Sequence, residues 1–308
     1  MNILIFLKSR YESFDLKKDL FQTIQKDFPS DEVFFADSTD SAKEKLPWAE
    51  IVITWVFPKK WYAQAPKLKA VFTPAAGKDW VQVDPTGKVE CHYGSFHGEM
   101  IAQSFLGMLL YFNNDYHISA LDQRQKKWGA TALKPRRLLK DQHLLIVGYG
   151  SIGRNCAEVV KALGMKVTGL QRQHTAGTDE LGVEYCRQED LPSVLASVDH
   201  ILFLLPNAAT TANFFTAENF KQLKSTAFLY NFGRGGCIDH QILLNALEEG
   251  EIAGAGLDVF ATEPLPEDDK LWSMDNVMIT PHSSCYFENY LPLFFEEVKG
   301  KIRRENLK

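Results

Sequence analysis

The sequence predicts an α/β protein built on doubly wound parallel sheets. Two observations support this prediction. Short apolar runs alternate with segments whose apolar residues recur at the spacing of one helix face, along almost the whole chain. A G-x-G-x-x-G turn at 148–153 also stands between an apolar run and a helical pattern, which is the context of a strand–turn–helix unit. Because the alternation occurs on both sides of this turn, we expect two such domains.

The N-terminal third of the chain predicts a small α/β unit. Its expected strands are 3–7, 33–35, 51–54, 70–73 and 89–92, and Leu16, Leu20, Ile24 and Phe28 predict a helix after the first strand. Ligands of open parallel sheets bind beyond the carboxyl ends of strands, which makes Trp55, Ala76, Gly77 and Lys78 candidate ligand residues. Segment 75–79 is either a carboxylate cradle of exposed backbone amides or a plain turn, and on its own it favours the turn.

The remainder of the chain continues the alternation. We expect strands at 144–147, 166–170, 201–205, 228–231, 254–260 and 277–280, with helices at 191–198 and 241–248. Residues 95–111 are apolar nearly all round, which predicts a helix buried between domains or subunits. The polar stretch 123–137 predicts a surface segment. Within it, Trp128 is either an ordinary exposed side chain or a contact across a dimer. Segment 287–302 predicts a helix that packs back on the first domain.

The glycine turn points to a bound dinucleotide. Gly148 permits the tight turn, Gly150 lets backbone amides approach a pyrophosphate, and Gly153 lets helix and strand pack closely. The anion would lie on unpaired N–H groups at the positive end of the helix dipole. The apolar strand before this motif, the helix after it and a second strand at 166–170 provide the context that the motif alone lacks.

The end of that second strand predicts which cofactor is preferred. NAD sites usually carry Asp or Glu there, which accepts hydrogen bonds from the ribose hydroxyls. This chain has Gln171, Arg172 and Gln173 instead, and a guanidinium suits a 2′-phosphate. We therefore expect NADP. The alternative is that Arg172 is simply solvated and that Gln171 binds the hydroxyl of NAD.

Composition excludes several other classes of protein. The chain has 308 residues and a formal net charge of −5, which argues against nucleic acid as a partner. It contains no apolar run of about 18 residues, so we expect no membrane span. Its five cysteines are scattered and form no C-x-x-C pair, which predicts a reducing cytoplasm and no metal site.

Three residues just past strand ends suit the reduction of a 2-keto acid. Such a reaction needs a cation for the carboxylate, a proton donor for the developing alkoxide and a group that tunes this donor. Arg234, His282 and Glu263 can supply these functions respectively. Taken singly, Arg234 could contact a phosphate, Glu263 could be a surface acid, and His282 could be a turn histidine.

Four motifs in this order resemble the D-isomer-specific 2-hydroxyacid dehydrogenases. They are Gly148–Gly153, Asn231–Gly236, the segment Leu257–Pro266 and Pro281–Ser284. The resemblance implies that Arg234 binds the substrate carboxylate, that His282 is the general acid/base and that Glu263 is its partner. It also implies that Gly77 and Lys78 offer amides to the carboxylate. Trp55, the strand end at Arg172 and the compact length look most like glyoxylate/hydroxypyruvate reductases.

The resemblance implies a domain layout and a cofactor site. A Rossmann NAD(P)-binding domain at 94–282 is expected to be inserted in a flavodoxin-like substrate domain at 1–93 plus 283–308, in a homodimer. Asn231 and Asp258 would lie near the nicotinamide. The residues expected to bind the cofactor are Gly148, Tyr149, Gly150, Ser151, Ile152, Gly153, Gln171, Arg172, Gln173, Leu205, Pro206, Asn207, Asn231, Phe232, Gly233, Asp258 and His282.

The sequence departs from the family at two places. Lys78 stands where a second glycine is more usual, so the pocket wall there is expected to differ. Pro281 replaces the glutamine of formate dehydrogenases, which argues against formate. Three alternatives stay open: a larger 2-keto acid, a cofactor-sensing module without turnover, and a phosphoglycerate-type biosynthetic enzyme.

Overall fold

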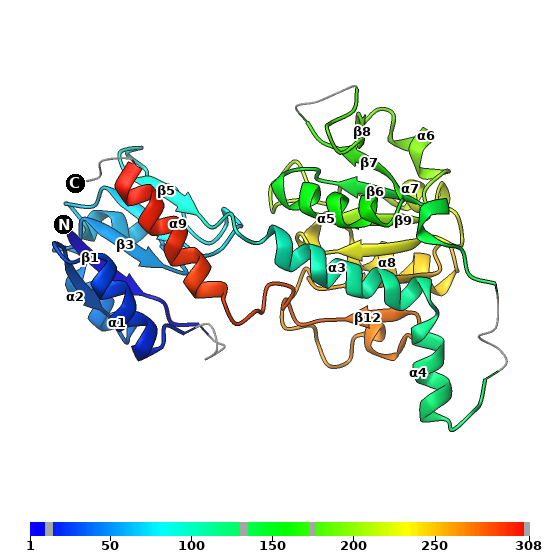
Figure 1. Cartoon of the computed structure of the whole chain (residues 1–308), viewed down its shortest axis with the longest axis horizontal. Helices are drawn as coiled ribbons and strands as arrows, with labels where there is room; N and C mark the ends of the chain where they lie inside the picture. The colour runs from blue at the N-terminus through cyan, green and yellow to red at the C-terminus, as the bar shows by residue number, and fades with distance from the viewer. Residues whose placement is uncertain (10–14, 130–134, 173–176, 305–308) are drawn as a thin grey trace. The chain divides into compact units, whose positions relative to one another are not determined.

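The chain divides into two compact units, each with its own parallel sheet (Figure 1). The computed structural model describes residues 1–9, 15–129, 135–172 and 177–304. Unit 1 consists of residues 1–97 and 286–308, and unit 2 consists of residues 98–285. Helices accompany both sheets, so the predicted α/β class with two doubly wound parallel sheets is confirmed.

The sheet of unit 1 has the strand order of a flavodoxin-like fold. Its strands are β1 (Asn2–Phe6), β2 (Glu32–Phe35), β3 (Ile51–Thr54), β4 (Ala70–Thr73) and β5 (Glu90–Tyr93). They lie in the order β2-β1-β3-β4-β5, and all neighbours are parallel. Strands β3 and β4 are buried along their whole length, as their continuous apolar runs predict. The strand order reverses between β1 and β3, where such sheets bind ligands at their carboxyl edge.

The helices of unit 1 come from both ends of the chain. They are α1 (Lys18–Asp27), α2 (Thr39–Lys45), the short 3-10 helix η2 (Lys59–Gln64) and α9 (Tyr290–Arg304). Helix α9 packs beside α1, where Lys299 Nζ lies 3.3 Å from Asp27 Oδ1 (Figure 1). Helix α2 was not predicted, because its sequence is short and mostly polar. Ser38 caps it by accepting a hydrogen bond from the amide of Ser41.

The sheet of unit 2 has the Rossmann strand order, extended by one strand. Its strands are β6 (His143–Val147), β7 (Lys166–Leu170), β8 (Glu184–Cys186), β9 (His200–Phe203), β10 (Phe228–Asn231), β11 (Gly254–Leu257) and β12 (Val277–Ile279). They lie in the order β12-β11-β10-β9-β6-β7-β8, all parallel. The order therefore reverses between β6 and β9, and the glycine turn follows β6.

The helices of unit 2 cover two separate hydrophobic cores. They are α3 (Gly98–Asn113), α4 (Tyr116–Arg124), α5 (Ser151–Ala162), α6 (Leu191–Leu195), α7 (Ala217–Lys221) and α8 (His240–Glu248), with short 3-10 helices at Leu139–Asp141, Gly235–Cys237 and Lys270–Ser273. Leu145 and Val147 belong to one core, whereas Leu144 and Ile146 belong to the other. This division follows from the alternation of side chains along a strand.

Helix α3 packs against α5 within unit 2. A Cβ at Gly98 would lie 2.3 Å from Asn155 Nδ2 of α5, so glycine permits the close approach. The sequence predicted this apolar helix, and its first turn begins at residue 98 rather than 95. The expected strand 254–260 ends at Leu257, because residues 258–263 form a loop.

Candidate active site

The glycine turn after β6 has the shape that a dinucleotide requires. Gly148 has φ +98°, and a Cβ there would lie 2.9 Å from the backbone of Leu204, so glycine is needed. Around Gly150 nothing lies within 4 Å of a Cβ position, which leaves open space beside its backbone. A Cβ at Gly153 would lie 3.2 Å from Gly148 O, so this glycine lets α5 pack closely beside the turn.

The N-terminus of α5 is prepared for an anion. Gly150 is the N-cap residue, and no side chain caps the helix. Within the part of the chain that the structure describes, the amides of Ser151, Ile152 and Gly153 donate no hydrogen bond. Open space beside Gly150 and three free N–H groups at a helix N-terminus fit the pyrophosphate of a dinucleotide.

The segment after β7 carries an exposed cation. Arg172 is exposed and Gln171 is half-buried, whereas Gln173 lies outside the described residues. Asp179, further along this segment, accepts hydrogen bonds from the hydroxyl of Tyr149 at 2.5 Å and from the amides of Leu181 and Val183. These bonds hold the pKa of Asp179 below its usual value, against the opposing effect of burial. The oxygens of the Asp179 carboxylate are therefore already hydrogen-bonded to groups of the protein.

The loops after β9 and β10 lie against each other. A Cβ at Gly233 would lie 2.6 Å from the backbone of Leu205, so Leu205, Pro206 and Asn207 are brought beside the loop that contains Phe232 and Gly233. Strand β9 borders the point where the strand order reverses, and β10 lies beside β9. The expected cofactor residues of these two loops thus meet at one edge of the sheet.

Asn231 organises the turn that carries Arg234. Its Oδ1 accepts the amide of Gly233 at 3.1 Å, and its Nδ2 donates to Arg234 O at 3.2 Å. Arg234 is half-buried, and its Nη1 donates to Gly233 O at 2.9 Å. A Cβ at Gly235 would lie only 1.9 Å from the backbone of Phe260, so this turn packs directly on the 258–263 loop.

His282 and Glu263 form a hydrogen-bonded pair. His282 Nδ1 lies 2.9 Å from Glu263 Oε2, and Glu263 Oε1 accepts the amide of Phe260 at 3.0 Å. The side chains of His282 and Glu263 are 34% and 23% exposed, so solvent and ligands can reach the pair. With Nδ1 donating its proton to the carboxylate, Nε2 is the nitrogen that can exchange a proton with a ligand.

The three candidate catalytic residues follow three adjacent strands. Arg234 follows β10, Glu263 follows β11 and His282 follows β12, and these strands are neighbours in the sheet. Parallel strands end at the same edge, so the sheet brings a guanidinium, a carboxylate and an imidazole to one side of unit 2. This set can bind a carboxylate and deliver a proton.

Unit 1 carries the other candidate residues at the carboxyl edge of its sheet. Trp55 follows β3, and its ring stacks on Tyr290 with centroids 5.8 Å apart. Ala76, Gly77 and Lys78 follow β4, and Ala76 and Lys78 are exposed. None of these three amides donates a hydrogen bond to the described residues, whereas the preceding amide of Ala75 donates to Thr73 Oγ1. These three consecutive amides are available to donate hydrogen bonds to an anion.

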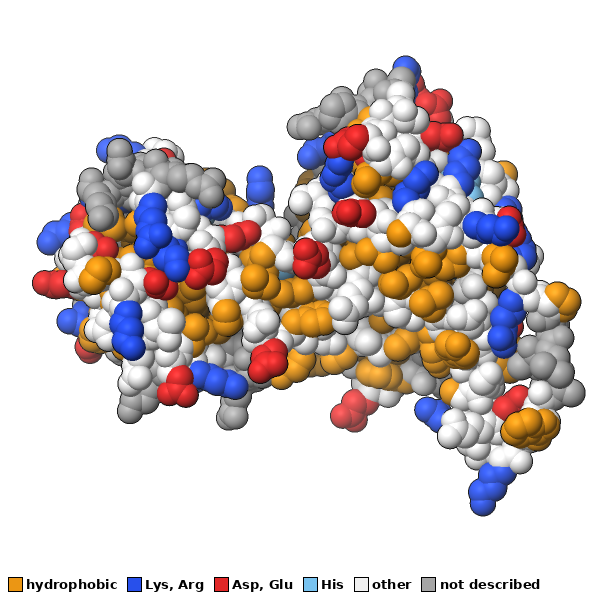
Figure 2. Space-filling model, viewed as in Figure 1, with side chains coloured by type: hydrophobic (Ala, Val, Ile, Leu, Met, Phe, Trp, Pro, Cys, Tyr) orange, Lys and Arg blue, Asp and Glu red, His pale blue; other side chains and the backbone are white. Residues whose placement is uncertain are grey.

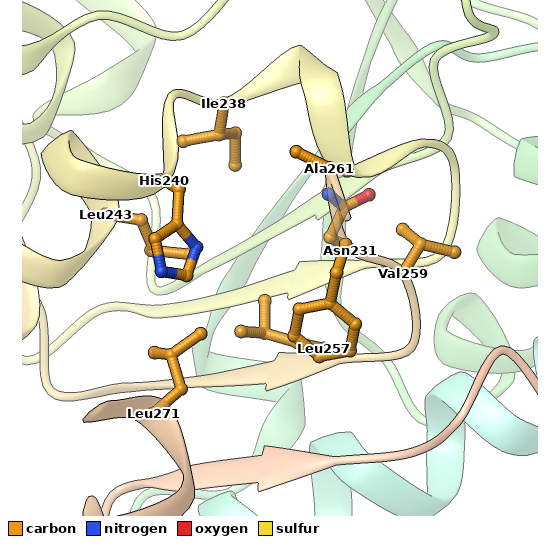
Figure 3. Close-up of a pocket in the computed structure, with 10 residues that line it drawn as sticks. Asn231, Ile238, His240, Leu243, Leu257, Val259, Ala261 and Leu271 are labelled. Atoms are coloured by element: carbon orange, nitrogen blue, oxygen red, sulfur yellow. The ribbon is translucent and has the colours of Figure 1, made fainter. Parts of the chain in front are cut away.

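A small cavity lies behind the Arg234 turn (Figure 3). Its volume is about 20 Å³, which is room for one water molecule. The side chains of Asn231 and His240, from different elements, surround it together with apolar groups such as Leu257 and Leu271. It is too small for a cofactor or a substrate and lies in the supporting structure of the site.

Sequence comparison identifies the family. Residues 106–284 match the model of the D-isomer specific 2-hydroxyacid dehydrogenase, NAD binding domain. The chain belongs to this dehydrogenase family. The resemblance predicted from the motifs is thereby confirmed, and unit 2 contains an NAD(P)-binding domain.

Named relatives of this dehydrogenase are 2-keto acid reductases. The glyoxylate/hydroxypyruvate reductase B of Escherichia fergusonii is 33% identical over 225 residues, covering 70% of this chain and 68% of the relative. The Escherichia coli enzyme of the same name is 34% identical over 260 residues, covering 78% of each chain. The predicted class, an NAD(P)-dependent oxidoreductase of the D-2-hydroxyacid dehydrogenase type, is confirmed.

Solved structures resemble the dehydrogenase over its whole length. A D-isomer specific 2-hydroxyacid dehydrogenase from Xanthobacter autotrophicus, solved with NADPH and MES, has a TM-score of 0.84 and 27% identity, covering 98% of this chain and 94% of its own. An NADPH-dependent glyoxylate/hydroxypyruvate reductase from Sinorhizobium meliloti, solved with NADP and sulfate, has a TM-score of 0.84 and 25% identity, covering 99% and 95%.

The dehydrogenase has features that sequence reasoning missed. Tyr149, Asp179 and Arg154 form a hydrogen-bonded cluster that links the glycine turn to the segment after β7. Because Asp179 lies 30 residues from Tyr149, no local pattern indicates this cluster. Among the described residues, no group of three or more His, Cys, Asp or Glu side chains is arranged to hold a metal ion. No helix in the described parts of the chain is long and apolar enough to cross a membrane.

Proposed function

We propose that this dehydrogenase reduces a small 2-keto acid of the glyoxylate or hydroxypyruvate type to its D-2-hydroxy acid, with NADPH. The observation that carries the proposal is the 2.9 Å contact between His282 Nδ1 and Glu263 Oε2, which follow β12 and β11, while Arg234 follows the next strand in the sheet, β10. The names of the relatives support the choice of substrate, because several are glyoxylate/hydroxypyruvate reductases.

Each catalytic residue has a proposed role that follows from its chemistry. Arg234 binds the substrate carboxylate through two parallel hydrogen bonds and polarises the neighbouring carbonyl. His282 gives the proton on Nε2 to the oxygen of that carbonyl as it becomes an alkoxide. Glu263 accepts the Nδ1 proton, which orients the ring and leaves Nε2 facing the substrate. The nicotinamide, when bound, supplies the hydride.

Unit 1 is proposed to be the substrate domain. The free amides of Ala76, Gly77 and Lys78 suit a carboxylate oxygen, and Trp55 follows the neighbouring strand β3. The proposed substrate domain consists of residues 1–93 plus 283–308, and the proposed cofactor domain consists of residues 94–282. This proposal rests on the position of both sets of residues at the carboxyl edges of their sheets.

NADP is the proposed cofactor because residues 171–178 contain no Asp or Glu that could accept hydrogen bonds from the ribose hydroxyls. Arg172 is exposed at the end of β7, and the oxygens of Asp179 are occupied by Tyr149 and two backbone amides. The guanidinium of Arg172 can pair with a 2′-phosphate, which NAD lacks. Gln171 and Gln173 are proposed to contribute polar contacts to the same part of the cofactor.

The decisive experiment measures oxidation of NADPH and NADH with glyoxylate and with hydroxypyruvate. We expect turnover with NADPH to exceed turnover with NADH by at least about tenfold, since one charged pair contributes on the order of 1–3 kcal/mol. A preference for NADH would refute the role of Arg172. Turnover of only longer 2-keto acids would refute the substrate class. Binding of NADPH without any turnover would favour a sensing module.

A matched pair of variants isolates Arg172. Arg172→Ala should weaken NADPH binding at least about tenfold and leave NADH binding within about twofold. Arg124→Ala removes the same charge from α4, where Arg124 is exposed, and should change neither affinity. Equal loss of affinity for both cofactors in Arg172→Ala would contradict a contact to the 2′-phosphate.

The proposed assembly is a homodimer. Half-buried apolar side chains at Leu106, Leu110 and Tyr111 remain on α3, and Figure 2 shows hydrophobic side chains gathered over this helix on the face of unit 2 in view. Trp128 is fully exposed. Light scattering should give twice the monomer mass, and Trp128→Ala should weaken the association. The five cysteines are scattered along the sequence and odd in number, which supports the cytoplasm as the proposed location.

A further inference from the structure

Asp258 is a fully buried carboxylate that receives three hydrogen bonds from one short turn. It follows β11 and has 0% exposure. Its Oδ1 accepts the hydroxyl of Thr280 at 2.6 Å and the amide of Ser283 at 2.8 Å. Its Oδ2 accepts the amide of Ser284 at 3.2 Å. The donors lie on both sides of His282 in the sequence, so the carboxylate is hydrogen-bonded to the turn before and after this residue.

His282 has a backbone conformation that needs outside support. Its φ is +53°, the left-handed region that residues with a side chain rarely adopt. Its amide donates to Asp258 O at 2.8 Å and to Thr280 O at 3.0 Å. Residues in such conformations persist only where the surroundings fix them. Asp258 accepts four hydrogen bonds from residues 280–284, three with its side chain and one with its backbone carbonyl.

The ring of His282 is fixed from a second direction. Glu263 holds Nδ1, and Glu263 itself is held by the amide of Phe260, only two residues after Asp258. One loop, 258–263, therefore fixes the backbone of His282 at one end and its imidazole at the other. If the backbone support is lost, the ring can no longer stay 2.9 Å from Glu263.

We propose that Asp258 is a positioning residue, which holds His282 in the left-handed conformation that presents its ring to Glu263. The family resemblance implies that Asp258 lies near the nicotinamide, and in the structure its side chain accepts hydrogen bonds from the 280–284 turn. The consequence for turnover rests on the proposed function. The positioning itself is a property of the protein without ligands.

The first test observes His282 directly, without cofactor or substrate. Protein with ¹⁵N-labelled histidine gives imidazole signals by NMR, and the spectrum of His282→Gln identifies the signal of His282. In Asp258→Asn, the side-chain NH₂ must face at least one N–H or O–H donor of the turn. We expect the His282 signal to move toward that of a free imidazole, as in Glu263→Gln. An unchanged His282 signal in folded Asp258→Asn would overturn the proposal.

The second test separates positioning from cofactor binding. We expect kcat of Asp258→Asn with NADPH to fall between about 10-fold and 100-fold, because misplaced general acids lose most of their effect. The Kd for NADPH should stay within about threefold. A rise in Kd with unchanged kcat would overturn the proposal. Absence of turnover in the wild-type protein would refute the proposed function and leave the NMR result valid.

Milder variants and a control distinguish the loss of His282 positioning from a general loss of stability. Thr280→Val removes one bond to Asp258 and should lower kcat about threefold, and Thr280→Ser, which keeps the hydroxyl, should restore it. Asp199 is also buried and also accepts a backbone amide, that of His143 at 3.0 Å, but it precedes β9 at the opposite edge of the sheet. Asp199→Asn should lower Tm without lowering kcat. Equal losses of kcat in Asp199→Asn and Asp258→Asn would refute specific positioning.

Discussion

Adding one methyl group at Gly235 should displace Arg234 and disable catalysis. The Cβ of an alanine at this position would lie 1.9 Å from Phe260 C and 2.2 Å from Ala261 N, where ordinary contact begins at 3.4 Å. Both neighbours are backbone atoms, so no side chain can rotate away. The Arg234 turn and the 258–263 loop must therefore separate by about 1.5 Å, which is the difference between these contact distances.

The expected magnitude follows from that displacement. A misplacement of about 1 Å costs about 100-fold in rate, or about 2.7 kcal/mol of transition-state stabilisation. Overpacking should also lower the free energy of unfolding by about 1–3 kcal/mol. The assay measures kcat/KM for the 2-keto acid and a urea unfolding curve. Gly236→Ala is the matched control, because nothing lies within 4 Å of its Cβ position. Equal activities of the two variants would refute the reasoning.

Three further predictions concern the pair of His282 and Glu263, the glycine turn and a buried histidine. Glu263→Gln should lower kcat at least about tenfold with KM nearly unchanged, because the carboxylate orients the imidazole that delivers the proton; a change in KM alone would contradict this. Tyr149→Phe should lower the free energy of unfolding by about 1–3 kcal/mol, measured in urea, since Asp179 loses a hydroxyl donor; an unchanged curve would contradict it. Burial lowers the pKa of His200 from 6.5 to about 4. Below pH 6.5 the unfolded state binds a proton that the folded state does not, so stability falls by about 2 kcal/mol between pH 7.5 and 5. His200→Gln should show a smaller fall, and an equal fall would exclude His200 as the source.

Strands with a continuous apolar run were predictable, whereas short elements of mixed polarity were not. The continuous apolar runs of β3, β6 and β9 have no alternative to burial in a parallel sheet. Strand β8 has three residues and helix α7 has five, so each spans little more than one period of its pattern, and each contains charged or polar residues that interrupt an apolar run. Their existence depends on packing against neighbours that local sequence does not reveal.

The types of the site residues could be predicted, but their supporting contacts could not. Arg234, Glu263 and His282 each follow a recognisable strand, and carboxyl ends of parallel strands meet at one edge. The bonds of Asp258 to the turn around His282 join residues 22 to 26 positions apart. The same holds for Tyr149 and Asp179, because only the fold brings such residues together.

Unit 1 is formed by two separate segments of the chain, and this has a consequence for its synthesis on the ribosome. Its sheet is complete by residue 93, but α9 joins it only after residues 98–285 have been made. At 5–20 residues per second, about 10–40 s pass between these events on the ribosome. Unit 2, whose ends are tied by the bond from Ser104 Oγ to Ser284 O at 2.8 Å, can finish folding in this interval. The domain that begins the chain is therefore the last to be completed, and until then it exposes the apolar surface that α9 covers.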